Sequence, residues 1–315
     1  MPMQDMDIRD AFFDELYDIA AADSDVLFLT ADMGAFSLER FKKNLNRQYI
    51  NVGVAEQNMI SVATGLTLGG KKVFVYAVAP FVTMRCYEQI KVNISGMCLP
   101  ITIIGAGPGI TYNSDGPTHH AVQDIAIMRA LPGMVILNPS DPVMASRMAR
   151  ISYESEKPVY VRIDKGKLPR LYSEEGDFSH GLSLVKPGHD LLIITTGVMV
   201  HTALALADKL KMHSIDCGVI DLYRIKPVNE SLLLHCIART GKLITLEEHS
   251  IIGGIGSIIS EVLTDNMILK PLKRLAIKDR TLEKYGDREW MHKQYGLDFD
   301  QVKNTIIRGL NNGNR

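Results

Sequence analysis

Short apolar runs alternate with amphipathic stretches along the first half of the chain. Runs of the length of buried strands cover residues 26–30, 72–76, 101–104, 134–137 and 159–163. Between them, apolar positions recur at helical spacing over 8–16, 60–68, 84–94, 123–129 and 142–153. Fully apolar strands that alternate with helices are typical of a parallel sheet covered on both faces. The pattern therefore predicts an α/β domain over residues 6–170.

The alternation lapses after residue 167, where Pro, Gly, Ser and charged residues carry no periodic apolar face. We predict a linker over 171–188. Beyond it, apolar runs at 191–197, 217–220 and 242–246 alternate with helical patterns near 199–212, 229–238 and 256–263. The fold class is therefore expected to be α/β, with a second, smaller and mainly parallel domain over 189–315.

Composition narrows the possible partners. A chain of 315 residues with 46% hydrophobic residues can bury the cores of two domains. Its 35 basic and 36 acidic residues nearly cancel and form no basic block, so no nucleic-acid or membrane partner is expected. The sequence shows no apolar signal core and no run of 18 apolar residues, which predicts a cytoplasmic protein.

The cysteines indicate neither a metal centre nor a redox pair. They are Cys86, Cys98, Cys217 and Cys236, which lie far apart and form no CxxC motif. We therefore expect buried free thiols and no metal site on this chain.

A single carboxylate stands among small and apolar residues at 49–59, where a strand should lead into a helix. This residue is Glu56. A partly desolvated carboxyl group shares a proton readily with a neighbouring nitrogen base. An acid in the first turn of a helix also complements the helix dipole, so this segment alone does not distinguish a functional from a structural role.

Two further segments follow predicted strands. Phe81, Met84 and Tyr87 recur every three residues and should share one helical face, as core side chains or as a stacking surface for a planar ligand. The glycine-rich stretch 105–120 ends in Asp115-Gly-Pro-Thr-His119-His120, which gathers an acid and two imidazoles on a turn. Its glycines lack the last position of a dinucleotide fingerprint, so we interpret it as a binding loop, with solvent-exposed turn histidines as the alternative.

In this order and spacing, the three segments resemble the transketolase family. Segments 29–34, 131–141 and 245–256 also resemble family segments, so the resemblance covers nearly the whole chain. It implies a thiamine-diphosphate-dependent transferase, related to deoxyxylulose-phosphate synthase, that moves a two-carbon ketol unit between sugars or sugar phosphates. The chain would hold the pyrimidine-binding and C-terminal domains of a split transketolase.

The resemblance also assigns roles to residues. In the family, the glutamate matching Glu56 binds N1′ of the aminopyrimidine and promotes removal of the proton from thiazolium C2. Phe81 and Tyr87 match aromatic residues of the pyrimidine pocket, and Met84 stands where transketolase usually has the stacking phenylalanine. Asp32 matches an acid near the thiazolium.

The substrate side of the family's site is matched by Asp115 and His119, which would contact sugar hydroxyls or the ketone and move protons there. His120 is a bystander candidate. Lys165 replaces an arginine that holds substrate phosphate, and a lysine binds phosphate as a point charge only. Gly107 and Pro108 replace the family's histidine or arginine. The resemblance therefore leaves both phosphorylated and unphosphorylated sugars open as substrates.

The family's diphosphate and magnesium site uses a Gly-Asp-Gly motif, and this sequence contains none. The resemblance therefore implies that Mg²⁺ and the cofactor's phosphates are held by a separate N-terminal diphosphate-binding subunit. It further implies an α2β2 heterotetramer in which the C-terminal domain supports self-association. Three alternatives remain: a beta subunit of a 2-oxo acid or acetoin dehydrogenase, a deoxyxylulose-phosphate-synthase-like enzyme, and a non-enzymatic scaffold or regulatory subunit.

Overall fold

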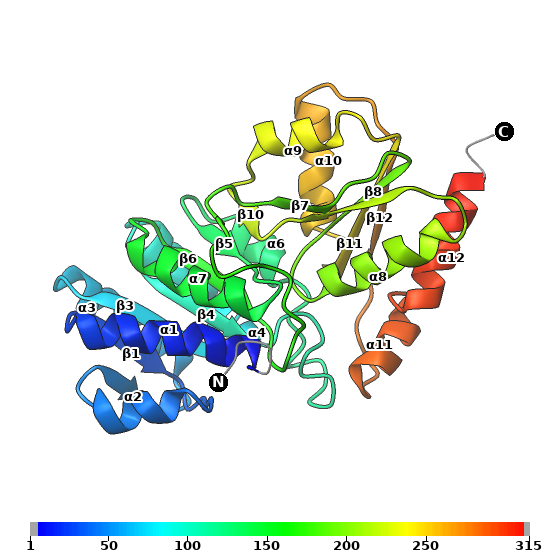
Figure 1. Cartoon of the computed structure of the whole chain (residues 1–315). Helices are drawn as coiled ribbons and strands as arrows, with labels where there is room; N and C mark the ends of the chain where they lie inside the picture. The colour runs from blue at the N-terminus through cyan, green and yellow to red at the C-terminus, as the bar shows by residue number, and fades with distance from the viewer. Residues whose placement is uncertain (1–5, 312–315) are drawn as a thin grey trace.

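The computed structural model describes residues 6–311, which form two α/β units (Figure 1). The strands of the first sheet are β1 (Val26–Thr30), β2 (Tyr49–Asn51), β3 (Lys72–Val78), β4 (Thr102–Ala106), β5 (Val135–Leu137), β6 (Val159–Ile163) and β10 (Arg224–Lys226). Their order in the sheet is β10-β5-β6-β4-β3-β1-β2. All of them pair in parallel except β10, which runs antiparallel to β5.

Helices cover both faces of this sheet. They are α1 (Ile8–Ala22), α2 (Leu38–Asn44), α3 (Glu56–Leu68), α4 (Ala79–Thr83), α5 (Tyr87–Gln89), the π-helix η2 (Ile90–Ser95), α6 (Asp124–Arg129) and α7 (Pro142–Glu154). Phe12 and Phe13 of α1 share one apolar cluster with α7 and with Phe28 and Tyr76 of the strands. The opposite set of strand side chains packs on α3, η2 and α6. The sheet is thus buried on both sides, as fully apolar strands require.

The second sheet is built from β7 (Ser183–Lys186), β8 (Leu191–Thr195), β9 (Cys217–Asp221), β11 (Lys242–Ser250) and β12 (Leu272–Ile277), in the order β12-β11-β8-β9-β7. Its helices are α8 (Met199–Lys211), α9 (Glu230–Ile237), α10 (Ile255–Asp265), α11 (Arg288–Tyr295) and α12 (Phe299–Asn311). Only β7 is antiparallel to its neighbour within these described strands. The predicted class of two successive, mainly parallel α/β units is confirmed.

The two units share an apolar contact. One cluster runs from Ile103 and Ile136 of the first sheet through α6 to Ile194 of the second sheet and Ile259 of α10. Strand β10 comes from the second half of the chain but completes the first sheet beside β5 (Figure 1). Because apolar burial and a shared strand join them, side chains of the second unit can support loops of the first.

The structure corrects several expectations. The helix expected over 84–94 is broken: α4 ends at Thr83, and a turn precedes α5 and η2. The linker expected over 171–188 contains the edge strand β7. Cys98 is exposed and Cys236 half-buried, so only two of the four cysteines are buried thiols. Their spacing did not reveal this, because burial depends on packing between distant segments.

Within residues 6–311, no helix is both long enough and apolar enough to span a bilayer.

Candidate functional site

The predicted site residues follow the carboxyl ends of neighbouring parallel strands. Asp32 follows β1, Glu56 follows β2, and Lys165 follows β6. Phe81 lies on α4 directly after β3, and the loop 107–120 follows β4. Carboxyl ends of parallel strands share one edge of a sheet, which is where open α/β folds bind ligands. The topology therefore brings these segments to one edge.

Glu56 is the first residue of α3 and is only 3% exposed. The cap residue, Ala55, offers no side-chain hydrogen bond to the helix, so the carboxylate of Glu56 is the acidic group of the first turn. Its Oε2 accepts a hydrogen bond from Nη1 of Arg85 at 2.8 Å. Among residues 6–311, its Oε1 has no hydrogen-bond partner. A buried carboxylate therefore keeps one oxygen for a ligand.

Arg85 joins this carboxylate to the aromatic part of the site. Its guanidinium carbon lies 4.2 Å from the centroid of the Phe81 ring, a cation–π distance. The Phe81 ring in turn meets the His119 imidazole edge-on, with centroids 4.9 Å apart. Glu56, Arg85, Phe81 and His119 thus form a continuous series of contacts from α3 to the glycine-rich loop.

The break after α4 explains how Arg85 reaches Glu56. The amide N–H groups of Met84 and Arg85 both donate to the Pro80 carbonyl, which closes a turn there. The carbonyl of Arg85 is thereby free to accept a hydrogen bond from the Gln57 side chain at 3.0 Å. A continuous helix would have used that carbonyl in its own ladder.

The other two residues of the predicted aromatic face take different positions. Tyr87 is half-buried on α5, and its hydroxyl donates to the Ile127 carbonyl at 3.1 Å. Met84 is 36% exposed. Of the three, Phe81 contacts both Arg85 and His119.

The glycine-rich loop places Tyr112 beside Lys165. The Lys165 ammonium lies 4.4 Å from the centroid of the Tyr112 ring, and that ring is 6.1 Å from the His119 imidazole. Thr118 Oγ1 is 3.0 Å from His119 Nδ1, and Asp115 is exposed. Lys165 is exposed as well, so this part of the site presents charge to solvent.

Asp32 differs from the other predicted site residues in its backbone conformation, and His120 differs in its burial. Asp32 adopts φ 55°, a left-handed conformation that aspartate tolerates, and its carboxylate accepts a hydrogen bond from Asn51 at 3.1 Å. His120 is buried, which excludes the alternative of a solvent-exposed turn histidine at this position, and burial lowers the pKa of its imidazole. His120 therefore favours the neutral form within the fold.

Sequence reasoning did not single out Arg85. An arginine at a predicted helical surface position is usually solvated, and the break that turns it toward Glu56 arises from tertiary packing. Nothing in the local sequence signalled this turn, because the helix expected over 84–94 would have carried Arg85 on its surface.

Glu56 and Phe81 together can bind a planar nitrogen base. Glu56 offers a buried acceptor, and Phe81 offers an aromatic surface beside it. For a metal, the described part of the chain holds no group of three or more His, Cys, Asp or Glu side chains suited to bind an ion.

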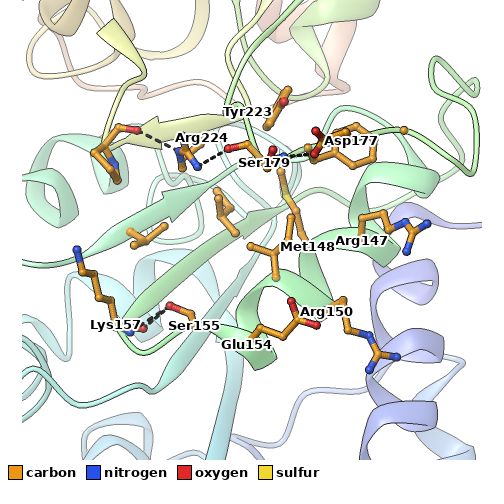
Figure 2. Close-up of a pocket in the computed structure, with 16 residues that line it drawn as sticks. Arg147, Met148, Arg150, Glu154, Ser155, Lys157, Asp177, Ser179, Tyr223 and Arg224 are labelled. Atoms are coloured by element: carbon orange, nitrogen blue, oxygen red, sulfur yellow. Dashed lines mark hydrogen bonds between the residues drawn. The ribbon is translucent and has the colours of Figure 1, made fainter. Parts of the chain in front are cut away.

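A pocket of about 630 Å³ lies elsewhere, between α7, the strand β5 and the segments 176–179 and 223–227 (Figure 2). Its floor is largely apolar, and Figure 2 shows Arg147 and Arg150 pointing away from its centre. Arg224 at its rim is held by the carbonyls of Ser179 and Pro227. Because its charged groups do not converge, this pocket is a weaker candidate than the edge with Glu56.

Comparison with known proteins gives two family matches. Residues 4–170 match the family described as transketolase, pyrimidine binding domain, and residues 181–302 match the transketolase C-terminal domain.

Individual proteins are similar over nearly the full chain. One subunit of the apulose-4-phosphate transketolase of Phocaeicola vulgatus is 34% identical over 303 residues, covering 95% of this chain and 96% of that protein. The 6-deoxy-6-sulfo-D-fructose transketolase subunit SqwH of a Clostridium species is 33% identical over 297 residues, covering 94% and 92%. A solved structure described as a split gene transketolase, inactive beta4 tetramer, has a TM-score of 0.86 and 29% identity, and covers 98% of this chain and 99% of that one.

Proposed function

The chain belongs to the transketolase family, and from that premise we propose that it supplies the pyrimidine-side half of a thiamine-diphosphate-dependent ketol-transfer site. Glu56 is the residue that binds the cofactor's ring nitrogen. The enzyme assembled from both subunits moves a two-carbon unit between sugars or sugar phosphates.

One observation carries this proposal: Glu56 is buried at the start of α3, with Oε2 bound to Arg85 and Oε1 open. When bound, thiamine diphosphate supplies an acidic carbon that becomes the nucleophile and then stores the electrons of the transferred unit. Glu56 would hold N1′ of the aminopyrimidine by a hydrogen bond, which requires a carboxyl group shielded from competing water. Phe81 and Tyr87 would flank the ring, with Met84 at its exposed edge and Asp32 toward the thiazolium.

The loop 107–120 would contact the sugar. His119 is packed edge-on against Phe81, so its imidazole lies beside the proposed ring site and can exchange a proton with a substrate oxygen. Asp115 is exposed at the same turn and can accept hydrogen bonds from sugar hydroxyls. Lys165, above Tyr112, is the cation available to a substrate phosphate.

A second subunit would hold the diphosphate and Mg²⁺. Two of the relatives are named as subunits of transketolases, and the structural relative is described as a split gene transketolase whose beta4 tetramer is inactive. These names support the proposal that this chain, too, acts with a partner. We infer an α2β2 assembly in which the C-terminal domain takes part in self-association.

The test is reconstitution. The purified chain is assayed alone and with its cognate diphosphate-binding subunit, using ketose phosphate donors and aldose phosphate acceptors with thiamine diphosphate and Mg²⁺. We expect ketol transfer only in the mixture. Turnover by this chain alone would contradict the split site, and decarboxylation of 2-oxo acids without ketol transfer would favour a dehydrogenase beta subunit.

A further inference from the structure

The start of the glycine-rich loop rests on a buried carboxylate from the second unit. The amide N–H of Ile110 donates to Oε1 of Glu248, on β11, at 2.7 Å. Gly109 precedes it with φ +61°, and a Cβ there would lie 2.2 Å from the same oxygen. Gly109 and Ala121 exchange backbone hydrogen bonds of 2.9 and 2.8 Å, which close the base of the loop. The loop therefore begins at a fixed point set by Glu248.

Glu248 is held in turn by α11. Arg288 donates to both carboxylate oxygens, from Nε and Nη2, at 2.9 Å each. The imidazole of His292 lies 2.5 Å from Oε2. Burial alone would favour the neutral acid, but Arg288 and His292 more than offset it and lower the pKa of Glu248 far below its ordinary range. The carboxylate is thus charged, immobile and fully engaged.

Arg288 also reaches the first unit. Its Nη2 donates to Oδ2 of Asp164 at 2.8 Å. Oδ1 of Asp164 lies 2.9 Å from the Thr111 hydroxyl and accepts the amide N–H of Lys165 at 2.8 Å. One guanidinium therefore connects, through two buried carboxylates, to Ile110, Thr111 and Lys165.

We infer that Glu248 and Arg288 are positioning residues that fix the loop 107–120, and with it Asp115 and His119, relative to Phe81 and Glu56. The catalytic consequence of this inference rests on the proposed function. The contacts of Glu248 and Arg288 with the loop, which we call the clamp, are a property of the chain itself. Two neighbouring loop residues are held by charge-assisted contacts, so the loop cannot shift without breaking them. Displacements of about 1 Å at such a loop can cost about 100-fold in rate.

The experiment compares Arg288→Gln with Arg239→Gln, which removes the same charge from an exposed arginine of the second unit. Each variant is studied as the full chain and in the reconstituted complex. For Arg288→Gln we expect faster hydrogen–deuterium exchange of peptides covering 107–120, with residues 56–68 unchanged. We also expect a raised donor KM and a donor kcat/KM that falls by up to about 100-fold, while the Kd for thiamine diphosphate changes less than twofold.

A second pair of variants keeps the inference testable if Arg288→Gln does not fold. Thr111→Val removes the hydroxyl, which lies 2.9 Å from Asp164 Oδ1 and 2.6 Å from the Pro108 carbonyl oxygen, and Thr111→Ser retains it. The clamp predicts faster loop exchange and a raised donor KM in Thr111→Val, with wild-type behaviour in Thr111→Ser. Unchanged loop exchange in folded Arg288→Gln, or equal behaviour of the two Thr111 variants, would overturn the inference. If wild-type complex shows no ketol transfer, the proposed function fails, and loop exchange alone decides whether the clamp exists.

Discussion

The Glu56 carboxylate and the Arg85 guanidinium meet at 2.8 Å, with the carboxylate side chain 4% exposed and the guanidinium side chain 43% exposed. We interpret Arg85 as the residue that satisfies one oxygen of the buried Glu56 carboxylate and leaves the other to a ligand.

A double-mutant cycle tests this pairing in the chain alone. Arg85→Ala leaves the buried carboxylate unpaired, whereas Arg85→Ala combined with Glu56→Gln leaves no charge to satisfy. Because Arg85 is partly exposed, solvent screening limits the coupling free energy to about 1 kcal/mol. Urea unfolding measures it. The Arg150–Glu15 pair has an equally exposed arginine but a more exposed carboxylate, and should show a smaller coupling. Additive effects of the Glu56 and Arg85 changes would refute the pairing.

Lys165→Ala tests the phosphate assignment in the reconstituted enzyme. We expect the KM of a phosphorylated substrate to rise about tenfold, since a lost charge-assisted contact costs on the order of 1.4 kcal/mol. An unphosphorylated analogue should change less than twofold. Steady-state kinetics with both substrates gives the comparison, and exposed Lys167→Ala is the control. If the KM values of both substrates rise equally in Lys165→Ala, the phosphate role is wrong.

Asp221 makes a specific contribution to pH-dependent stability. Burial raises the pKa of Asp221 from 3.8 to about 7, although Ser140 and Tyr172 donate hydrogen bonds to its Oδ2. The folded chain then binds this proton more tightly than the unfolded chain, so the free energy of unfolding falls as pH rises through this interval. The loss is on the order of a few kcal/mol.

The variant Asp221→Asn lacks this titration and keeps an oxygen for Ser140 and Tyr172. Its stability relative to the native chain should therefore improve from about pH 4 to about pH 7, the interval set by the two pKa values. Urea unfolding of both proteins across this range measures the difference in their free energies of unfolding. The contributions of other titrating groups are shared by both proteins and cancel in that difference. Exposed Asp265→Asn should show no such trend. Parallel pH profiles for Asp221→Asn and the native chain would contradict the account.

The sequence predicted the fold class because apolar runs and helical spacing report burial directly. The start of α3 at Glu56 and the helix α7 from Pro142 agree with the predicted pattern, and Asp141 caps α7 through the Met144 amide. Strand β10 and edge strand β7 were not predicted, because both are short and depend on partners far along the chain. Such pairing leaves little periodic signal.

The sequence proposed the residues of the candidate site one by one but not the contacts between them. Glu56, Phe81, Asp115 and His119 stood out through the family resemblance. The roles of Arg85 and Arg288 depend on a helix break and on contacts across more than a hundred residues, such as Arg288 with Asp164. Local patterns in one sequence do not show which arginine meets which carboxylate, since that choice is made by tertiary packing.

The most direct test of Glu56 is hydrogen–deuterium exchange at C2 of thiamine diphosphate in the reconstituted complex, followed by quenched-flow NMR. Glu154→Gln, which removes an exposed carboxylate on α7, serves as the matched control. Glu56→Gln should assemble with the partner subunit and slow the exchange at least about 100-fold, the range for a lost acid–base group. Glu154→Gln should exchange at the native rate. An undiminished exchange rate in assembled Glu56→Gln would contradict the assignment of Glu56 as the cofactor-activating residue.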